Sequence, residues 1–286
     1  MKPPTTKVII FNAAAILITV GALFGVLRSY VFKPTAAPCT ERYVNATNFA
    51  LERAGVVLVA ADLQSSLGGN DAGLLENLQI GPLAGAPTRN VISVNLPQGS
   101  GSPWSETQPS GGTSFPWQPR VTQGKTAVCL SYSVLLPESF AFHRGGVLPG
   151  IRGADQSGQT ADGFLARLAW RTDHRGGATL RVTTGDKTER LVAEREAFDF
   201  PQGRWVKLEL EAVLNTPPTQ ANGTLRAWAD GRLVIDRTDM VYRSKANVAV
   251  SGVSADVFYG VEGASPTAAA PKDTKLSLTP FDLRWQ

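Results

Sequence analysis

From Thr126 onward, apolar side chains recur at every second position, and this alternation constrains the fold more than any other feature of the chain. A period of two places successive side chains on opposite faces of a strand, whereas a helical face would repeat every three to four residues. The segment 205–214 therefore predicts an antiparallel strand with one face in the core and one in solvent. Its apolar members are Val206, Leu208, Leu210 and Ala212, and its charged members are Lys207, Glu209 and Glu211.

Turn signals separate further strands of this kind. Asp230-Gly231 lies between two such runs and predicts a two-residue hairpin, because glycine tolerates positive φ. Clusters of glycine, proline and serine at 99–103 and 109–112 mark loops. The strands are closely spaced, the helical pattern is weak, and about 250 residues are enough for one large all-β domain. We therefore predict an all-β fold, an antiparallel two-sheet jelly roll (a concanavalin-like sandwich) over residues 45–286.

Residues 8–27 form an uncharged run, VIIFNAAAILITVGALFGVL, that predicts one N-terminal transmembrane helix. At 1.5 Å per residue its 20 residues span about 30 Å, the thickness of the hydrocarbon core of a bilayer. A cleaved signal peptide and a buried core helix are the alternatives. A signal peptide would need a shorter apolar region with a small-residue cleavage site directly after it. We therefore interpret 1–33 as an uncleaved signal-anchor and 34–44 as a stalk.

Positive charge is concentrated in that N-terminal segment. Residues 1–33 contain four basic side chains and no acidic one, and the remaining chain contains 24 basic and 24 acidic side chains. The net charge of +4 therefore belongs to the anchor, which argues against a nucleic-acid partner. Lysines before the span favour a cytoplasmic N-terminus. We expect a single-pass membrane protein with the lipid bilayer as partner of 8–27 and the domain on the extracytoplasmic side, periplasmic or extracellular.

The chain has two cysteines, Cys39 and Cys129. In an oxidising compartment they could form a disulfide that closes a separation of 90 residues, worth about 4 kcal/mol in the chain-entropy description. Two unpaired thiols, with Cys129 as a small core residue, are the alternative. Their spacing matches neither a metal site nor a redox motif, so we expect no metal and no cofactor.

The segment 164–171 (FLARLAWR) has one apolar face and one face that carries arginine. The second face presents Arg167 and Arg171, and a returning strand at 179–182 adds Arg181 to the same open sheet face. Arginine suits planar, bidentate recognition of carboxylates. We therefore predict a groove for an anionic chain such as a uronic-acid polysaccharide. The alternative is a solvated sheet face whose arginines pair with Asp155, Asp162 and Asp173.

Two histidines lie in loops beside this region. His143 and His174 are therefore candidate proton-transfer groups, although a lone loop histidine is often only a surface residue. Arg144 and Arg152 complete the candidate substrate-binding set. The chain contains no serine-histidine-aspartate arrangement, phosphate-binding loop or dinucleotide fingerprint, which removes the commonest hydrolase, nucleotide and dehydrogenase motifs.

Several segments together resemble the jelly-roll domain of family 14 polysaccharide lyases. They are 90–100 (NVISVNLPQGS), 111–115 (GGTSF), 145–153 (GGVLPGIRG) and the arginine-bearing strand 164–171. The resemblance covers about residues 85–285. It implies cleavage of uronate-containing polysaccharides such as alginate by β-elimination. That reaction needs a neutralised uronate carboxylate, a base for the C5 proton and an acid for the leaving oxygen.

The resemblance also implies site positions, and most of them are substituted. It places a lysine at Val147, a serine at Leu165, an arginine at Arg167 and tyrosines near Thr179 and Arg181. Only Arg167 matches. An active lyase would therefore need a rearranged site, with Arg167 and Arg181 holding the carboxylate and one of three proton-transfer candidates, His143, His174 or the more core-like Tyr132.

Two functions remain open at this point. The first is a membrane-anchored, extracytoplasmic, lyase-like protein that acts on an acidic polysaccharide by β-elimination. The second is a non-catalytic acidic-glycan-binding or structural envelope protein with a degenerate lyase fold.

Overall fold

Strand β12 (Trp205–Val213) is the alternating segment, and it shows how the domain is built. Its apolar residues Val206, Leu208 and Leu210 are buried in the core, as the alternation predicts. It pairs antiparallel with β7 (Ala127–Leu135) and β13 (Gly223–Ala229). The hairpin from β13 to β14 (Arg232–Met240) turns at Asp230-Gly231, whose φ angles of 48° and 77° confirm the predicted turn.

The computed structural model describes residues 19–21, 36–67, 70–105, 109–155, 162–172, 174–185, 187–260 and 269–286, with only the backbone of 191–197. Within these residues β12 belongs to a sheet in the order β14-β13-β12-β7-β17-β5-β4, with β18 joining β7 and β1 joining β18. Its remaining strands are β17 (Thr274–Leu278), β5 (Val91–Leu96), β4 (Leu78–Gly81), β1 (Asn45–Asn48) and β18 (Asp282–Trp285).

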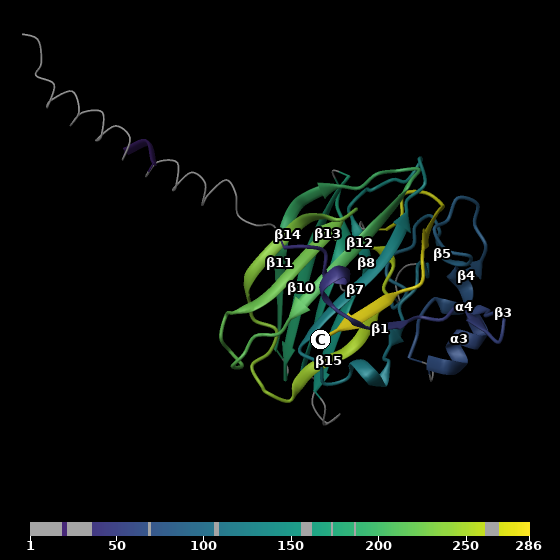
Figure 1. Cartoon of the computed structure of the whole chain (residues 1–286). Helices are drawn as coiled ribbons and strands as arrows, with labels where there is room; N and C mark the ends of the chain where they lie inside the picture. The colour runs from purple at the N-terminus through teal and green to yellow at the C-terminus, as the bar shows by residue number, and fades with distance from the viewer. Residues whose placement is uncertain are drawn as a thin grey trace, which may run out of the picture. The chain divides into compact units, whose positions relative to one another are not determined.

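A second antiparallel sheet packs against the first, in the order β11-β10-β9-β8-β15-β6, and β16 pairs with β8 (Figure 1). These strands are β11 (Lys187–Asp199), β10 (Arg175–Thr184), β9 (Gly163–Trp170), β8 (Gly146–Asp155), β15 (Val248–Ser254), β6 (Pro116–Trp117) and β16 (Phe258–Tyr259). Short elements complete the domain: α2 (Cys39–Arg42), α3 (Ala60–Leu67), α4 (Leu74–Asn77), η1 (Arg120–Thr122) and the hairpin of β2 (Glu52–Arg53) and β3 (Val56–Val57).

The core lies between the two sheets. Leu130 and Leu210 from the first sheet belong to the same buried apolar cluster as Ala166, Leu168 and Leu180 from the second. Each fully buried leucine contributes about 1.5–3 kcal/mol relative to an exposed one, so this layer is the main source of stability. The predicted two-sheet, all-β sandwich is confirmed.

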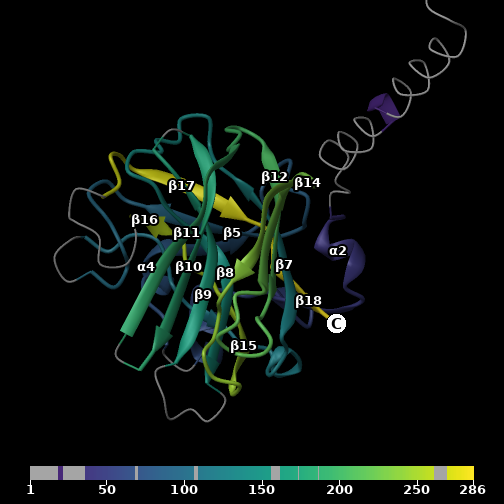
Figure 2. The same ribbon diagram turned by 90° about the vertical axis from the view of Figure 1, so that its left-hand side faces the viewer.

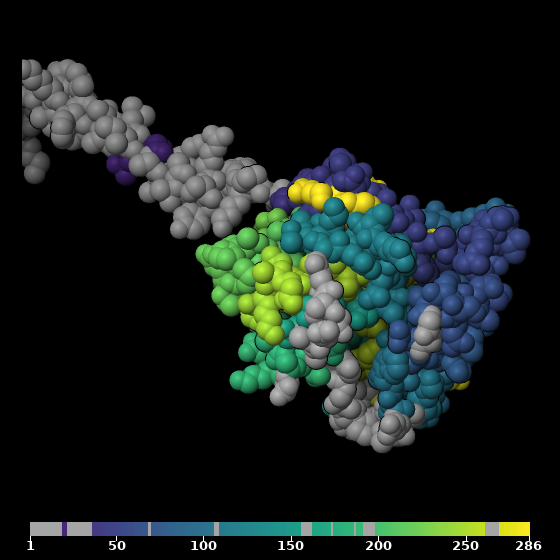
Figure 3. All heavy atoms as spheres, turned by 90° about the horizontal axis from the view of Figure 1, so that it is seen from below, coloured from purple at the N-terminus to yellow at the C-terminus, as the bar shows by residue number. Residues whose placement is uncertain are grey.

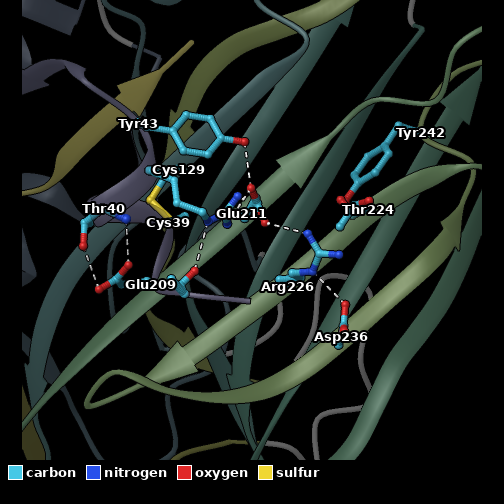
Figure 4. Close-up of polar contacts among 12 residues, drawn as sticks. Cys39, Thr40, Tyr43, Cys129, Glu209, Glu211, Thr224, Arg226, Asp236 and Tyr242 are labelled. Carbon is cyan, nitrogen blue, oxygen red and sulfur yellow. Dashed lines mark hydrogen bonds and ion pairs between the residues drawn. A yellow bond between two sulfur atoms is a disulfide. The ribbon is translucent and has the colours of Figure 1, made fainter. Parts of the chain in front are cut away.

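The outer face of β12 is covered by residues 38–43, which we call the strap. The predicted disulfide joins Cys39 of the strap to Cys129 of β7. The strap covers two glutamates, Glu209 and Glu211, that the alternation predicts to face solvent (Figure 4). Each is only 1% exposed. Figure 3 shows the strap region (purple) beside the C-terminal strand (yellow), in keeping with the pairing of β1 and β18.

Polar contacts between the strap and β12 satisfy both buried carboxylates. Glu209 accepts hydrogen bonds from the Thr40 backbone N–H and the Thr40 hydroxyl, both at 3.0 Å. Glu211 accepts from the Tyr43 hydroxyl at 2.7 Å and lies 2.8 Å from the guanidinium of Arg42 (Figure 4). Burial and the neighbouring Glu211 carboxylate raise the pKa of Tyr43, so this hydroxyl remains a donor.

The compact unit that contains both sheets begins at Ala37. Residues 37–44, assigned to a stalk from the sequence, therefore pack on the domain, because the disulfide and the buried glutamates hold them there. The predicted span 8–27 lies outside the described residues except for the helical residues 19–21. In the part of the chain that the structure describes, no helix has the length and apolar character needed to cross a bilayer.

Candidate functional site: an arginine-lined cavity on the outer face of the second sheet

A row of arginines crosses the second sheet at right angles to its strands. Arg152 of β8 pairs with Leu165 of β9, Leu165 pairs with Arg181 of β10, and Arg181 pairs with Arg190 of β11. Residues directly opposite one another in adjacent strands share a face of the sheet. Since Ile151 and the other alternate residues point into the core, the arginines point outward. Adjacent strands lie about 4.8 Å apart, so Arg152 and Arg181 are separated by about 10 Å of backbone.

The neighbouring row contains Arg167. Gly150 of β8, Arg167 of β9 and Thr179 of β10 lie opposite one another in it. Gly150 is required for this close approach, because a Cβ at that position would lie 2.4 Å from the Arg167 Cβ. The absence of a side chain on β8 lets the arginine lie low across the sheet.

A cavity of about 430 Å³ lies over these two rows. Arg152, Arg167 and Arg181 line it, together with Asp162 and Asp256 and the indole of Trp104. Three guanidinium groups face two carboxylates, so the lining has an excess of positive charge. The cavity therefore suits an anionic ligand.

Arg167 and Asp256 form a buried ion pair at the floor of the cavity. Their Nη1–Oδ2 distance is 2.9 Å, and both side chains are less than a tenth exposed. The second oxygen of Asp256 accepts hydrogen bonds from the hydroxyls of Ser114, at 2.7 Å, and Ser254, at 3.0 Å. The guanidinium carbon also lies 5.7 Å from the centre of the Phe258 ring. Arg167 is thus fixed in position and largely neutralised within the protein.

The electrostatics of Arg152 show that the arginines act on one another. Burial lowers the pKa of Arg152, attraction to Asp256 raises it, and repulsion from Arg181 lowers it. An arginine remains protonated at neutral pH despite such a shift. A bound anion between Arg152 and Arg181 would relieve their repulsion, which favours carboxylate binding at this point.

A second ion pair closes the end of the cavity. Asp162, just before β9, lies 2.6 Å from the Nζ of Lys245 and accepts a hydrogen bond from the Gly185 N–H at 2.6 Å. The Lys245 ammonium and the Gly185 N–H hold the pKa of the Asp162 carboxyl below its usual range. The β10–β11 turn and the loop after β14 are thereby tied to the start of β9.

The structure brings only some of the predicted site residues together. Arg152, Arg167 and Arg181 line the cavity, whereas Arg144, Arg171, His143 and His174 do not. Both histidines are exposed in loops at the opposite end of β8 and β9, where Gly146 pairs with Trp170. The candidate histidines therefore do not converge with the arginines, because the loops that hold them are several residues along the strands from Arg167.

Tyr132 is a core residue and does not line the cavity. It is 3% exposed, and its hydroxyl donates to the Pro149 carbonyl at 3.0 Å. Burial raises its pKa well above the ordinary value. Val147 is also fully buried, opposite Ala169. The sequence-based alternative pairs the arginines of this face with Asp155, Asp162 and Asp173. Asp173 lies outside the described residues, and Arg167 pairs with Asp256, two residues beyond β15.

One group of potential metal ligands occurs among the described residues. The side chains of Cys39, Cys129 and Glu209 lie within reach of one another, but the two sulfurs are joined in the disulfide.

The sequence analysis did not predict three residues of this region: Asp256, Arg190 and Trp104. Arg190 could have been found from the alternation of β11, whereas Asp256 and Trp104 lie outside alternating segments.

The fold and the cavity define an all-β jelly-roll protein with an anion-binding surface on one outer sheet face. The family model Polysaccharide lyase 14 matches residues 85–281, and the chain belongs to this family. That range contains both arginine rows and both cavity ion pairs.

Solved structures share the fold at low sequence identity. A marine PL-14 alginate lyase from Aplysia kurodai is 19% identical, with a TM-score of 0.63 over 78% of this chain and 94% of that one. The alginate lyase vAL-1 from Chlorella virus is 18% identical, with a TM-score of 0.62 over 79% and 97%. A variant of alginate lyase Aly36B in complex with alginate trisaccharide is 17% identical, with a TM-score of 0.60 over 88% and 100%. No curated protein matches the sequence.

Proposed function

We propose that this protein binds a uronate-containing acidic polysaccharide in the arginine-lined cavity. The observation that carries the proposal is the placement of Arg152 and Arg181 on either side of Leu165, on an open sheet face above the Arg167–Asp256 pair. Guanidinium groups recognise carboxylates in a bidentate manner. Family membership supports a uronate ligand, since relatives of this fold are described as alginate lyases.

A second candidate function is β-elimination on the same polysaccharide. The family match and the clustered arginines favour it, because neutralising the uronate carboxylate makes the adjacent C5 proton more acidic. The reaction also needs a base and an acid within hydrogen-bond reach of the sugar. Among the described residues that line the cavity, the titratable groups other than arginine are Asp162 and Asp256, and both are held in ion pairs. Binding is therefore the function that the geometry supports better.

The test is a titration of the full chain, in detergent, with a panel of polyuronates. We expect binding that weakens with added salt, because partly exposed guanidiniums make screened contacts. Arg181→Ala and Arg152→Ala should each weaken binding by about tenfold, the range for a lost charge-assisted hydrogen bond. Arg120→Ala is the matched control, since Arg120 is exposed on η1 and does not line the cavity.

The same samples separate the two candidate functions. Ultraviolet absorbance of the unsaturated product would appear during incubation if the protein is a lyase. Binding without product on every polyuronate supports the binding function alone. An absence of binding to all polyuronates, or binding that Arg152→Ala and Arg181→Ala leave unchanged, would overturn the proposal.

The proposed location is the extracytoplasmic side of a membrane, with residues 8–27 as the anchor. The uncharged run of 20 residues supports it, as does the Cys39–Cys129 disulfide, which is typical of oxidising compartments. Cell fractionation with alkaline extraction tests the anchor, and protease treatment of intact cells or spheroplasts tests the side. Recovery of the full chain in the soluble fraction would contradict the anchor.

A further inference from the structure

An exposed tryptophan borders the cavity. Trp104 lines it together with the arginines, yet the residue is 55% exposed, in contrast to the fully buried Trp170 and Trp228. The remainder of the lining is formed mainly by charged side chains, hydroxyls and glycines. Trp104 therefore offers an accessible aromatic face beside charged groups, and such a face can pack against the apolar side of a ligand.

The chain is anchored shortly before this indole. Gly99 donates its N–H to the Ala270 carbonyl at 2.8 Å, and Ala270 donates to the Ser100 carbonyl at 2.7 Å. The Ser100 hydroxyl donates to the Pro97 carbonyl at 2.6 Å and packs so closely on Gly111 that a Cβ there would lie 1.8 Å from the hydroxyl oxygen. The backbone is therefore held at residues 99–100, and the N–H groups of Trp104 and Ser105 bond back to Ser102, at 3.3 and 2.9 Å.

The pairing of an indole with guanidinium groups matches the chemistry of a uronate ring. A pyranose presents apolar C–H groups on its faces and, in a uronate, a carboxylate at its edge. An indole can cover the face while arginines bind the edge. A simple polyanion without rings, such as polyglutamate, would use the arginines alone.

We propose that Trp104 is the stacking platform for a sugar ring and makes the cavity select a pyranose uronate over other polyanions. This inference rests on the proposed binding function and deepens it, because it assigns the recognition of the ring to a residue outside the arginine rows. Arg152 and Arg181 then supply affinity for negative charge, and Trp104 supplies preference for carbohydrate.

The experiment compares two ligands on the full chain in detergent: alginate oligosaccharide and polyglutamate of similar charge. Trp104→Ala should weaken oligosaccharide binding by about tenfold and polyglutamate binding by less than twofold, because stacking on an aromatic ring is lost only for the sugar. Trp104→Phe should recover part of the loss. Arg181→Ala should weaken the binding of both ligands. Val59→Ala is the control, since Val59 is 59% exposed and does not line the cavity.

A fluorescence measurement provides a second readout. The spectrum of the wild type minus that of Trp104→Ala should shift to the blue when the oligosaccharide is added and should stay unchanged with polyglutamate. Equal unfolding midpoints for Trp104→Ala and Val59→Ala would show that the fold is intact.

The possible failures are distinguishable. If the wild type binds no polyuronate, the proposed function fails. Suppose that the wild type binds the oligosaccharide. If Trp104→Ala then binds it as tightly as Val59→Ala, or loses affinity for both ligands equally, the assignment of Trp104 fails while the binding function stands. Tighter binding of single-stranded DNA than of the oligosaccharide would also overturn it, because nucleobases stack on tryptophan as well.

Discussion

At the scale of single residues, Arg167 lies on the predicted outer face of β9, but it pairs with Asp256 instead of standing free for a ligand carboxylate. Its position on the outer face of β9 followed from the alternation of 164–171. The identity of its partner could not be predicted from that alternation, because Asp256 is 89 positions away and lies beyond a regular strand. A sequence pattern places a side chain on a face of a sheet, but a long-range ion pair depends on how distant loops meet. Arg167 thus lines the floor of the cavity as one half of an ion pair.

Removal of Arg167 should therefore affect folding before it affects binding. Arg167→Ala leaves the Asp256 carboxylate buried without its cation, which costs about 3–5 kcal/mol in the free energy of unfolding. Arg181→Ala, on the partly open face, should change that free energy by less than about 0.5 kcal/mol. Urea denaturation of both variants measures the difference. Equal, small losses would show that the pair contributes little to stability.

At the scale of elements, the cavity is closed by a contact between three connections. Asp162 precedes β9, Gly185 is in the β10–β11 turn, and Lys245 follows β14. The ladder of β8, β9 and β10 sets the spacing of the Arg152–Leu165–Arg181 row, and the contact between the three connections ties the ends of these strands to the loop after β14.

The Asp162–Lys245 pair predicts a pH dependence with a defined sign. The folded-state pKa of Asp162 is lowered, so the pair stabilises the fold above the ordinary aspartate value of 3.8 and loses that effect as the pH falls through the lowered pKa. Lys245→Met should therefore be less stable than the wild type at pH 7, and the difference should shrink below pH 3.8. Unfolding midpoints measured from pH 7 to pH 3 test this. A difference that stays constant with pH would assign the loss to packing instead.

The strap is the element that sequence periodicity could not reveal. The alternation of β12 correctly separated its two faces but assigned Glu209 and Glu211 to solvent. Thr40 and Tyr43, which cover them, lie 169 and 168 positions away in the chain. Burial of a charged strand face therefore depends on a distant segment with no periodic pattern of its own.

The disulfide that holds the strap should matter for stability and not for ligand binding. Replacing both Cys39 and Cys129 with alanine should lower the free energy of unfolding by about 4 kcal/mol, because the cross-link closes a separation of 90 residues in the unfolded chain. Polyuronate affinity should stay within twofold of wild type, since the strap and the cavity lie on different sheets. Denaturation with and without reductant, together with binding titrations, checks both parts. Loss of affinity in a folded variant would contradict the separation of the two faces.

At the scale of the whole molecule, the alternation of apolar residues predicted a fold of two packed sheets, but it could not predict the order of the strands in them. β17, from the end of the chain, lies between β5 and β7 and pairs with both. Such pairing is decided by packing between segments far apart in sequence, which an alternating pattern cannot specify. The same limit explains why the histidines, close to the arginine strand in sequence, are not part of the cavity.

The arrangement of the layers predicts how attachment affects binding. The strap lies on the outer face of the first sheet and the arginine rows on the outer face of the second, and Figure 2 shows α2 on the side of β7 and β12, away from β9 and β10. Immobilisation through the N-terminus or through Gln286 should leave polyuronate binding unchanged. Immobilisation through a Thr188→Cys variant on β11 should weaken it at least tenfold, because the support would then cover the edge of the arginine row. Surface plasmon resonance on the three orientations measures this, and equal binding in all three would contradict it.

The direction of the arginine row determines which part of a polymer the proposed site can bind. The row from Arg152 to Arg190 crosses β8, β9, β10 and β11 on their outer face. The row runs across open strands rather than into a closed tunnel, so no free end of the polymer is needed. If the row binds a polyuronate as proposed, a stretch in the middle of the polymer is as accessible as its end, and affinity depends on how many uronates lie in the row, not on how many ends the sample contains.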